Sequence, residues 1–460
     1  FPEYAALTQP RPLSLASTQQ LLGPDEALYF IAPTRGGSFV WLVTRTDVTW
    51  RKIDISARDL EREVAALRCG LDATQWVGES ALNCIDLTKT GLAPGNALLP
   101  FDLERAYKLY ALLFEPFQDQ MAGRELMVVS SGALSKLPFQ ALVTRPPSIT
   151  GYNATAYQAA SWLALKQAIT VLPAVGSLEA LRRTLRKSSP ATSFLGVANP
   201  LLDGDPATRS SDAERARRAQ QALNCSTAGN SKVHASQRTV RLTKLHAGRS
   251  GIADVALLRA QSPLPETADE VCQVGGLFDR THSKILLGRD ATEREIGRLN
   301  RRDELSRYGI VHFATHGALA GELAPGMEPG LILTPPKNAT SEDDGYLSVS
   351  EIAELKLNAD WVILSACNTA GEEEGSREAL SGLARAFFYA GARSLLVSHW
   401  AVDSDATVKL ITGAFEFARG SRRISKAEAM RQSMVALMKG GQPHLAHPAY
   451  WAPFVLAGAR

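Results

Sequence analysis

Two short hydrophobic runs in this sequence each end on a dipeptide that carries a reactive side chain. Residues 308–317 (YGIVHFATHG) end on His316 and Gly317, and residues 361–367 (WVILSAC) end on Cys367. Runs this short and this apolar are typical of buried strands in a parallel sheet. Open α/β sheets build their sites at the carboxyl edge of the strands. We therefore expect His316 and Cys367 to lie near each other at such an edge.

Strand patterns alternate with helical patterns through the later part of the chain, and this alternation predicts an α/β fold with a mostly parallel sheet. The first 100 residues differ. They carry a hairpin pattern at 27–32 and 38–44 and then a helical pattern at 56–67. We expect a small α+β region at 1–100 and a larger domain at 101–460, separated by the loop-like segment 83–100.

Residues 202–262 interrupt the larger domain with a polar stretch that contains more Lys and Arg than Asp and Glu. It shows little periodicity beyond one Arg/Ala-rich helical patch. We expect a mobile surface insertion here. A regulatory cleavage loop and a neutral insertion both remain open.

Composition excludes several classes of partner. The net charge is +3 over 460 residues, with 45% hydrophobic and 21% charged side chains. This balance gives no electrostatic case for nucleic acid or membrane binding, and no apolar run approaches the roughly 20 residues that span a bilayer. The chain opens at Phe1 without a signal-peptide pattern, so we expect it to derive from something longer whose address label is lost. The compartment is therefore left open.

The five cysteines are Cys69, Cys84, Cys225, Cys272 and Cys367. They form no CxxC pair, which argues against a structural zinc site. Without Cys367 an even four remain, and Cys69 and Cys84 are close in sequence. A disulfide in an oxidising compartment and four buried thiols in a cytosolic protein both fit this pattern.

Cys367 and His316 together are the minimum set for thiol nucleophilic catalysis. A free thiol has a pKa of about 8.5 and needs a partner to supply thiolate near neutral pH. His316 is the expected base, and later the acid that protonates the leaving amine. The backbone N–H groups of Gly317 and Cys367 are expected to bind the oxyanion, at roughly 3 kcal/mol per donor. Alone, each side chain would be interpreted as a buried core residue.

Other histidines and serines offer weaker alternatives. His312 lies four residues before His316 on the same predicted strand, so both side chains should share a face. With His399 or Asp403 they could hold a metal, but no HExxH pattern supports this, and we expect His312 to be a packed residue with no metal or cofactor. His444 and His447 are interpreted as structural. No GxSxG elbow occurs around Ser130, Ser131 and Ser135, so a serine hydrolase is not indicated.

The two dipeptides resemble the signature of the caspase, separase and gingipain clan of cysteine peptidases (clan CD). Within that clan the chain resembles the CHAT domain found in bacteria. The segments that carry this resemblance are VHFATHG (311–317), LSACNTAG (364–371), GLARAFFYAGARSLLVSHWAVDSDAT (382–407), HPAYWAPFVLAG (447–458), LYALLFEPF (109–117) and LSKLPFQAL (134–142). The likeness extends over about 101–459, with 202–262 as an interruption.

The resemblance implies a caspase-like α/β/α sandwich with a His316/Cys367 dyad. It also implies a tetratricopeptide-type module upstream, which this chain does not contain. Asp403 aligns with the segment where separase places a carboxylate for a basic P1 side chain, so Asp403, and Asp405 second, are candidates for the S1 pocket. Either aspartate would also suit the role of a helix cap.

These patterns predict an endopeptidase that cuts a protein partner under the control of an upstream interaction module. The alternative is a catalytically silent CHAT scaffold that binds other proteins. The acidic loop at 372–378 is a candidate switch between displaced and assembled forms of the site.

Overall fold

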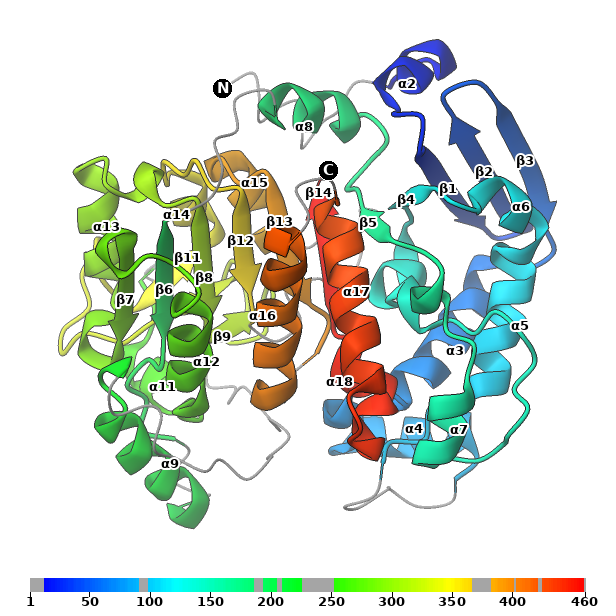
Figure 1. The fold of residues 1–460 in the computed structure, drawn as a ribbon. Helices are drawn as coiled ribbons and strands as arrows, with labels where there is room; N and C mark the ends of the chain where they lie inside the picture. Colours follow the sequence, from blue (N-terminus) through cyan, green and yellow to red (C-terminus); the bar gives the residue numbers. More distant parts are fainter. Residues whose placement is uncertain are drawn as a thin grey trace. The chain divides into compact units, whose positions relative to one another are not determined.

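The computed structural model of the chain describes residues 12–90, 98–185, 193–204, 209–225, 252–365, 382–400, 403–420 and 424–458. These residues form two compact units (Figure 1). The first unit takes the described residues up to 185 and those from 409 onward, and the second takes those from 193 to 408.

The second unit contains a fully parallel group of strands. Their bounds are β6 Phe194–Ala198, β7 Ser283–Leu287, β8 Ile310–Ala314, β12 Trp361–Leu364 and β13 Ser394–Ser398. Within the described residues the order is β13-β12-β8-β6-β7, and all four neighbouring pairs in this group are parallel. Every residue of β6, β8, β12 and β13 is buried. The predicted α/β class with a mostly parallel sheet is confirmed.

Helices connect these strands and cover them. The described helices of this unit are α9 Arg209–Gln221, α11 Val255–Arg259, α12 Glu266–Gly275, α13 Glu293–Arg301, α14 Val349–Ala353, α15 Gly382–Ala390 and the start of α16 Ser404–Gly420. The connection from β6 to β7 runs outward in the sheet and the connection from β7 to β8 runs back. Right-handed crossovers therefore put α12 and α13 on opposite faces, and α12 lies in front of the sheet in Figure 1.

Two glycines let α12 lie directly on the strands beneath it. A Cβ on Gly196 of β6 would stand 2.1 Å from Cγ1 of Val271, and a Cβ on Gly275 would stand 2.8 Å from Cδ1 of Ile285. No real side chain fits at such distances. The absence of these two side chains therefore sets how closely α12 approaches β6 and β7.

A smaller antiparallel sheet follows β8. It consists of β9 His316–Ala318, β10 Gly330–Ile332 and β11 Tyr346–Ser348, in the order β11-β10-β9. The run predicted as one strand at 308–317 is thus two strands in different sheets. Because the chain leaves β8 after Ala314, His312 and His316 do not share a strand, and the expectation that they share a face is wrong.

The first unit has a mixed sheet. Its strands are β1 Glu26–Thr34, β2 Gly37–Thr44, β3 Val48–Ile53, β4 Glu125–Val129, β5 Ile169–Val171 and β14 Phe454–Gly458. The predicted hairpin is confirmed as the antiparallel β1–β2 pair. β1 also pairs in parallel with β4. Residues on both sides of the expected boundary near 100 therefore belong to one compact unit.

The helices of the first unit pack around that sheet. Their bounds are α2 Leu15–Leu21, α3 Ala57–Cys69, α4 Glu79–Thr88, α5 Leu103–Leu113, α6 Gln118–Met121, α7 Ala154–Ala159, α8 Ser177–Leu185, the end of α16, α17 Lys426–Lys439 and α18 Pro448–Trp451. Ser56 caps α3, accepting a hydrogen bond from the N–H of Asp59 at 3.1 Å. No helix in the described part of the chain combines the length and the apolar character that a membrane crossing requires.

Each unit contains one disulfide. Cys69 of α3 pairs with Cys84 of α4, and Cys225 pairs with Cys272 of α12. The disulfide alternative therefore holds for four of the five cysteines. The first bridge also explains a difference from the sequence prediction, because the start of the segment expected to be a loop at 83–100 is helical through residue 88 and fastened to α3.

Parts of the predicted insertion at 202–262 are ordered. Residues 209–221 form α9, and α11 contributes Leu257 and Leu258 to a hydrophobic cluster with Leu323, Ile332 and other buried side chains. These segments are packed into the second unit, which differs from the expected mobile insertion. Residues 205–208 and 226–251 lie outside the described residues.

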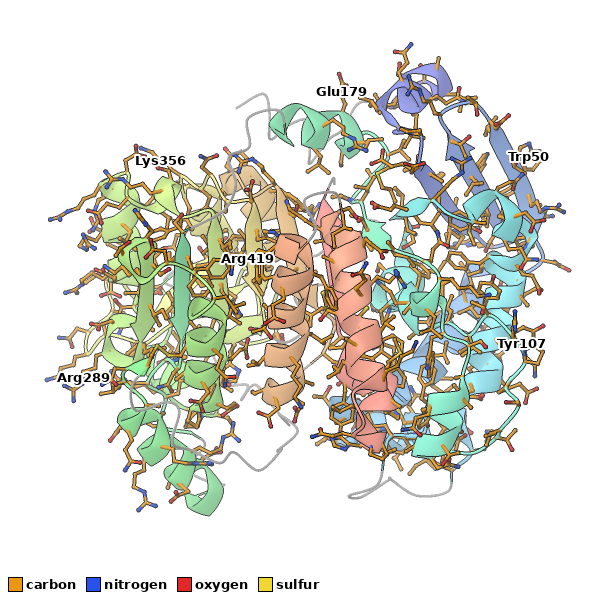
Figure 2. All side chains as sticks on the ribbon, in the orientation of Figure 1. Trp50, Tyr107, Glu179, Arg289, Lys356 and Arg419 are labelled. Carbon is orange, nitrogen blue, oxygen red and sulfur yellow. A yellow bond between two sulfur atoms is a disulfide. The ribbon has the colours of Figure 1, made fainter. Side chains whose placement is uncertain are left out.

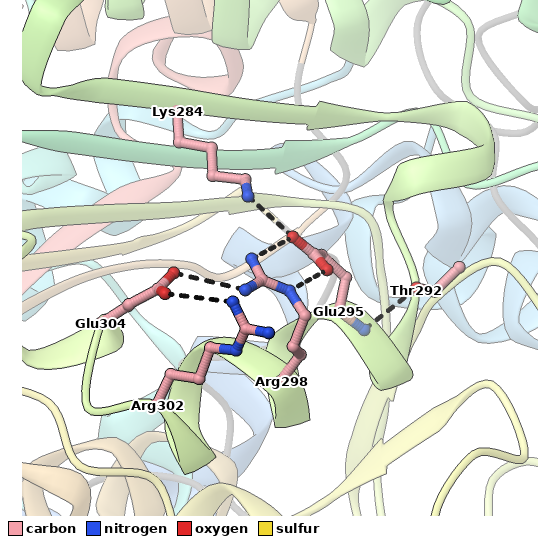
Figure 3. A network of polar contacts seen from close by, with 6 residues as sticks. All are labelled: Lys284, Thr292, Glu295, Arg298, Arg302 and Glu304. Carbon is pink, nitrogen blue, oxygen red and sulfur yellow. Dashed lines mark hydrogen bonds and ion pairs between the residues drawn. The ribbon is translucent and has the colours of Figure 1, made fainter.

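A network of charged side chains fastens α13 to the outer strand β7 (Figure 3). Glu295 accepts hydrogen bonds from Arg298 at 2.7 Å and from Lys284 of β7 at 2.7 Å, and Arg298 also contacts Glu304 at 3.5 Å. The hydrogen bond from Arg298 is the largest cause that lowers the pKa of Glu295 to about 2. Since these groups are partly exposed, water screens their charges and the network contributes little to stability.

The outer strand of the first unit, β3, is more exposed to solvent than β7. Trp50 of β3 is 59% exposed (Figure 2) and pairs in register with Trp41 of β2, whose ring stacks on Phe30 at a centroid distance of 5.3 Å. The three aromatic residues therefore lie in a row across adjacent strands of this sheet.

His447 is a buried histidine whose two ring nitrogens are both satisfied by the backbone. Its Nε2–H donates to the carbonyl of Leu99 at 2.9 Å, and its Nδ1 accepts from the N–H of Ala449 at 3.1 Å. Burial lowers the pKa of His447 to about 4. The ring is held neutral with a fixed tautomer, in agreement with its interpretation as structural.

His447 should make the first unit sensitive to acid. The unfolded chain protonates this ring near pH 6.5 and the folded chain only near pH 4. The free energy of unfolding should therefore fall by about 3 kcal/mol between pH 6.5 and pH 4. Denaturant titrations of His447→Gln should give a flatter pH dependence over this window. The exposed His444, changed to Gln as a control, should leave the dependence as in the parent chain, and equal slopes for all three proteins would contradict the assignment.

Candidate functional site

His316 is the first residue of β9 and its side chain is buried, with 1% of its surface exposed. Its Nε2 lies 2.7 Å from the carbonyl oxygen of Ser262. A carbonyl oxygen only accepts hydrogen bonds, so Nε2 carries the proton. In the neutral ring the lone pair is then on Nδ1, which is the nitrogen able to take a proton.

The carboxyl ends of β8 and β12 lie side by side, and β8 ends two residues before His316. Leu364 pairs with Phe313, and the N–H of Ser365 donates to the carbonyl of Phe313 at 3.1 Å. The pairing thus continues one residue past β12. Cys367 follows two residues later and lies outside the described residues. Its position beside His316 stays a prediction, as does the role of the 372–378 loop.

Gly317 is the central residue of β9, opposite Leu331 of β10. The residue is buried. The small sheet therefore fixes the backbone of the His-Gly dipeptide and of Ala318 after it. The role of Gly317 in binding an oxyanion remains a prediction.

The segment that carries Ser262 is held from both directions. Arg215 of α9 donates to the carbonyl of Pro263 at 2.9 Å and pairs with Glu266 at 3.0 Å. The Cys225–Cys272 disulfide joins the residues just after α9 to α12. These contacts brace the carbonyl acceptor of His316 against the helix that follows it.

His312 lies inside the second unit and contacts two polar side chains. Its Nε2 is 3.0 Å from Oε1 of Glu270 and 2.9 Å from Oγ of Ser365, and Ser365 also donates to Glu270. The sequence offers His312 and His316 as possible metal ligands, together with His399 or Asp403. Across the described ranges, no group of three His, Cys, Asp or Glu side chains is arranged to hold a metal ion.

The two candidate S1 aspartates differ in their surroundings. Asp403 is 8% exposed, and its Oδ1 accepts from the N–H of Ala406 at 2.9 Å, as an N-cap residue of α16 does. Asp405 is exposed in the first turn of that helix. A carboxylate has two oxygens, so capping does not decide whether Asp403 also lines S1, and that assignment stays a prediction.

Asp405 affects the pKa of the Asp269 carboxyl, a group that the sequence analysis does not single out. The pKa of Asp269 on α12 is raised to about 6, first by burial and then by the negative charges of Asp405 and Glu266. Asp269 is therefore within electrostatic reach of Glu266 in the first turn of α12 and of Asp405 in the first turn of α16.

Sequence reasoning missed Ser262, Glu270 and Asp269. Glu270 could have been found, because it falls on the apolar stripe of α12 with Val271 and Val274, where a charged side chain requires a partner. Ser262 acts through its backbone carbonyl, and a carbonyl carries no residue-specific signal.

A family model described as the CHAT domain matches residues 103–459. The chain belongs to the CHAT domain family. The resemblance predicted from the His-Gly, Ala-Cys and neighbouring segments is thereby confirmed, and His316 lies within the matched part of the domain.

Known proteins similar to this CHAT chain include tetratricopeptide repeat protein 28 of Homo sapiens and of Mus musculus. The human protein is 26% identical over 229 residues, which cover 43% of this chain and 8% of that protein. The mouse protein is 25% identical over 224 residues, which cover 43% of this chain and 9% of that protein. The matched parts are thus a small fraction of either relative.

Two solved structures are also similar. Separase in the Saccharomyces cerevisiae separase–securin complex matches with 11% identity and a TM-score of 0.45, covering 96% of this chain and 30% of that one. The Arg-specific cysteine proteinase gingipain R matches with 9% identity and a TM-score of 0.38, covering 81% of this chain and 72% of that one.

The capping role of Asp403 can be measured as stability. Asp403→Ala should lower the free energy of unfolding by about 1 kcal/mol, because the N–H of Ala406 loses its acceptor. Asp403→Asn should stay near the parent value, since asparagine caps equally well, and Asp405→Ala should change little. Chemical denaturation of the three variants distinguishes them. If Asn is as destabilising as Ala, the carboxylate does not act as a cap.

Proposed function

We propose that this chain is a cysteine endopeptidase in which His316 and Cys367 form the catalytic dyad. The observation that carries the proposal is the hydrogen bond from Nε2 of His316 to the carbonyl of Ser262. It orients a buried imidazole with its lone pair on Nδ1, close in the fold to the strand that leads to Cys367. A histidine fixed in one tautomer is what a general base requires.

The reaction follows from that tautomer. Nδ1 of His316 takes the thiol proton, and the thiolate sulfur of Cys367 forms a bond to the carbonyl carbon of the substrate. The carbonyl electron pair moves onto oxygen, where the N–H groups of Gly317 and Cys367 stabilise it. When the oxyanion collapses, the C–N bond breaks and Nδ1–H of His316 gives its proton to the leaving amine. Water, deprotonated by the same nitrogen, then hydrolyses the thioester.

The proposed substrate is a protein or peptide with a basic P1 side chain. Support comes from acidic groups of the second unit, because Asp405 is close enough to raise the pKa of Asp269 and Asp403 precedes Asp405 by two residues. A lysine or arginine side chain placed among them would be attracted by their charges.

An upstream interaction module is the proposed regulator. The similarity to tetratricopeptide repeat protein 28, whose name states such repeats, supports a link between this domain and repeats that bind protein partners.

One observation favours the alternative of a silent scaffold. The side chain of His316 is 1% exposed, and a base that reaches a substrate needs access to it. In the peptidase proposal the site opens when a partner or substrate binds. In the scaffold alternative it stays closed and cleaves nothing.

Cleavage of a P1-diverse peptide library tests the peptidase directly. The parent chain should cleave, and both Cys367→Ala and His316→Ala should reduce kcat by at least about 10³-fold, since each removes half of the dyad. His312→Gln is not a suitable control because it disturbs the interior, whereas the exposed His444→Gln should retain full activity. Cleavage that survives in Cys367→Ala would exclude the proposed nucleophile.

The P1 profile tests the acidic groups. Asp403→Asn keeps the helix cap but removes the charge, so it should lose the preference for Arg and Lys without losing stability. Asp405→Asn should weaken that preference to a smaller extent. An unchanged P1 profile in both variants would contradict an S1 role for either aspartate.

The preference should also depend on pH. The pKa of Asp269 is about 6, so this carboxyl gains its negative charge as the pH rises through 6. The ratio of kcat/KM for Arg over norleucine at P1 should therefore increase between pH 5 and pH 7. Asp269→Asn should remove that part of the increase. A ratio with the same pH dependence in the variant would place Asp269 away from the P1 side chain.

A further inference from the structure

Glu270, His312 and Ser365 form a polar cluster inside the second unit that takes no part in the proposed chemistry. The side chains of Glu270 and His312 are fully buried, and Ser365 is 1% exposed. None of them can reach a substrate. Buried polar groups of this kind are costly unless they satisfy one another, so their presence requires an explanation.

The hydrogen bonds determine which nitrogen of the His312 ring donates to its partners. Nε2 of His312 lies within bonding distance of both Glu270 and Ser365, and the Ser365 hydroxyl donates to the same carboxylate oxygen. Ser365 therefore accepts from Nε2–H, which is shared between the two. Nδ1 of His312 has no partner in the part of the chain that the structure describes.

The three side chains come from the three segments that build the candidate site. Ser365 extends β12, two residues before Cys367. His312 is on β8, four residues before His316. Glu270 is on α12, which begins four residues after Ser262. One cluster of hydrogen bonds thus joins three segments of the chain. They lead to Cys367, to His316 and to Ser262, whose carbonyl accepts the hydrogen bond of His316.

The packing around the cluster explains how Glu270 reaches His312. Gly196 of β6 pairs in register with His312. Its missing side chain admits Val271 of α12, the residue next to Glu270. The carboxylate is therefore brought to His312 by the close approach of α12 to the sheet, and it can bond both partners only at that approach.

We propose that Glu270, His312 and Ser365 are positioning residues that hold Ser262, His316 and the chain leading to Cys367 in the geometry needed for catalysis. The inference rests on the proposed function, because it concerns how that dyad is aligned. Loss of the cluster would allow small relative shifts of β8, β12 and α12, and a shift of about 1 Å at reacting atoms can cost about 100-fold in rate.

The thiol itself provides a readout that needs no substrate. Four of the five cysteines are in disulfides, so under non-reducing conditions iodoacetamide should modify Cys367 alone, as mass spectrometry can verify. The midpoint of its alkylation rate against pH reports how well His316 supports the thiolate. Peptide cleavage is measured in parallel.

Ser365→Ala and Glu270→Ala are the test variants, and Asp360→Asn is the matched control. Asp360 forms a buried pair with Arg393 at 2.9 Å at the start of β12, at the opposite end of this strand from Ser365. Its loss should lower stability without moving the site. Glu270→Gln keeps an acceptor oxygen and should recover much of the loss seen with alanine.

In Ser365→Ala and Glu270→Ala the alkylation midpoint should rise by about one pH unit, and kcat should fall about 10- to 100-fold with KM changed less than about 3-fold. Asp360→Asn should show neither change at a similar melting temperature. Alkylation midpoints in the test variants equal to that of Asp360→Asn would overturn the positioning role. So would an ordinary thiol midpoint near pH 8.5 in the parent chain. A parent chain with a lowered midpoint that cleaves no peptide would instead remove the peptidase proposal and leave the positioning role decided by alkylation.

Discussion

The approach of α12 to β6 is the constraint on which the second unit depends. Gly196 has no side chain at the point where Val271 lies against the strand, and any larger residue would push the helix away. At this separation Glu270 reaches His312, and the segment before the helix brings the carbonyl of Ser262 to His316. The packing at Gly196 therefore determines both the contact of His312 on β8 with Glu270 and the contact of His316 on β9 with Ser262.

Much of the fold follows from local patterns in the sequence. The short apolar runs that end at Ala314 and Leu364 become paired parallel strands, because residues buried on both faces of a sheet are apolar throughout. The β1–β2 hairpin and the Ser56 cap of α3 follow from turn and capping residues. In each case the signal lies within about ten residues of the structure that it predicts.

The remainder depends on partners distant in sequence. The break between β8 and β9 occurs because residues 330–332 pair with 316–318, and nothing within the run 308–317 announces that partner. The carbonyl of Ser262 has no side-chain signature, and the relation of Asp405 to Asp269 arises only when α12 and α16 come together. The sequence offers His316 and Cys367 as candidates for a dyad, whereas it gives no sign of the groups that orient and surround His316.

Three buried histidines illustrate how hydrogen-bond partners assign roles to one residue type. His447 has both nitrogens bonded to the backbone and has no capacity left for chemistry. His312 is held by a carboxylate and a hydroxyl deep in the unit. His316 has Nε2 within hydrogen-bond distance of the Ser262 carbonyl, which defines its tautomer. Similar burial thus accompanies different roles, and the acceptors distinguish them.

The Cys225–Cys272 disulfide joins two cysteines that are 47 residues apart in the sequence, the first after α9 and the second in α12. A peptide bond broken anywhere between these two cysteines would yield two polypeptides that remain covalently linked. The piece carrying α9 would stay attached, and with it Arg215, which braces the carbonyl of Pro263 next to Ser262. A molecule cut between Cys225 and residue 252 would therefore keep its mass on a non-reducing gel, and Arg215 would still support the segment whose Ser262 carbonyl binds His316.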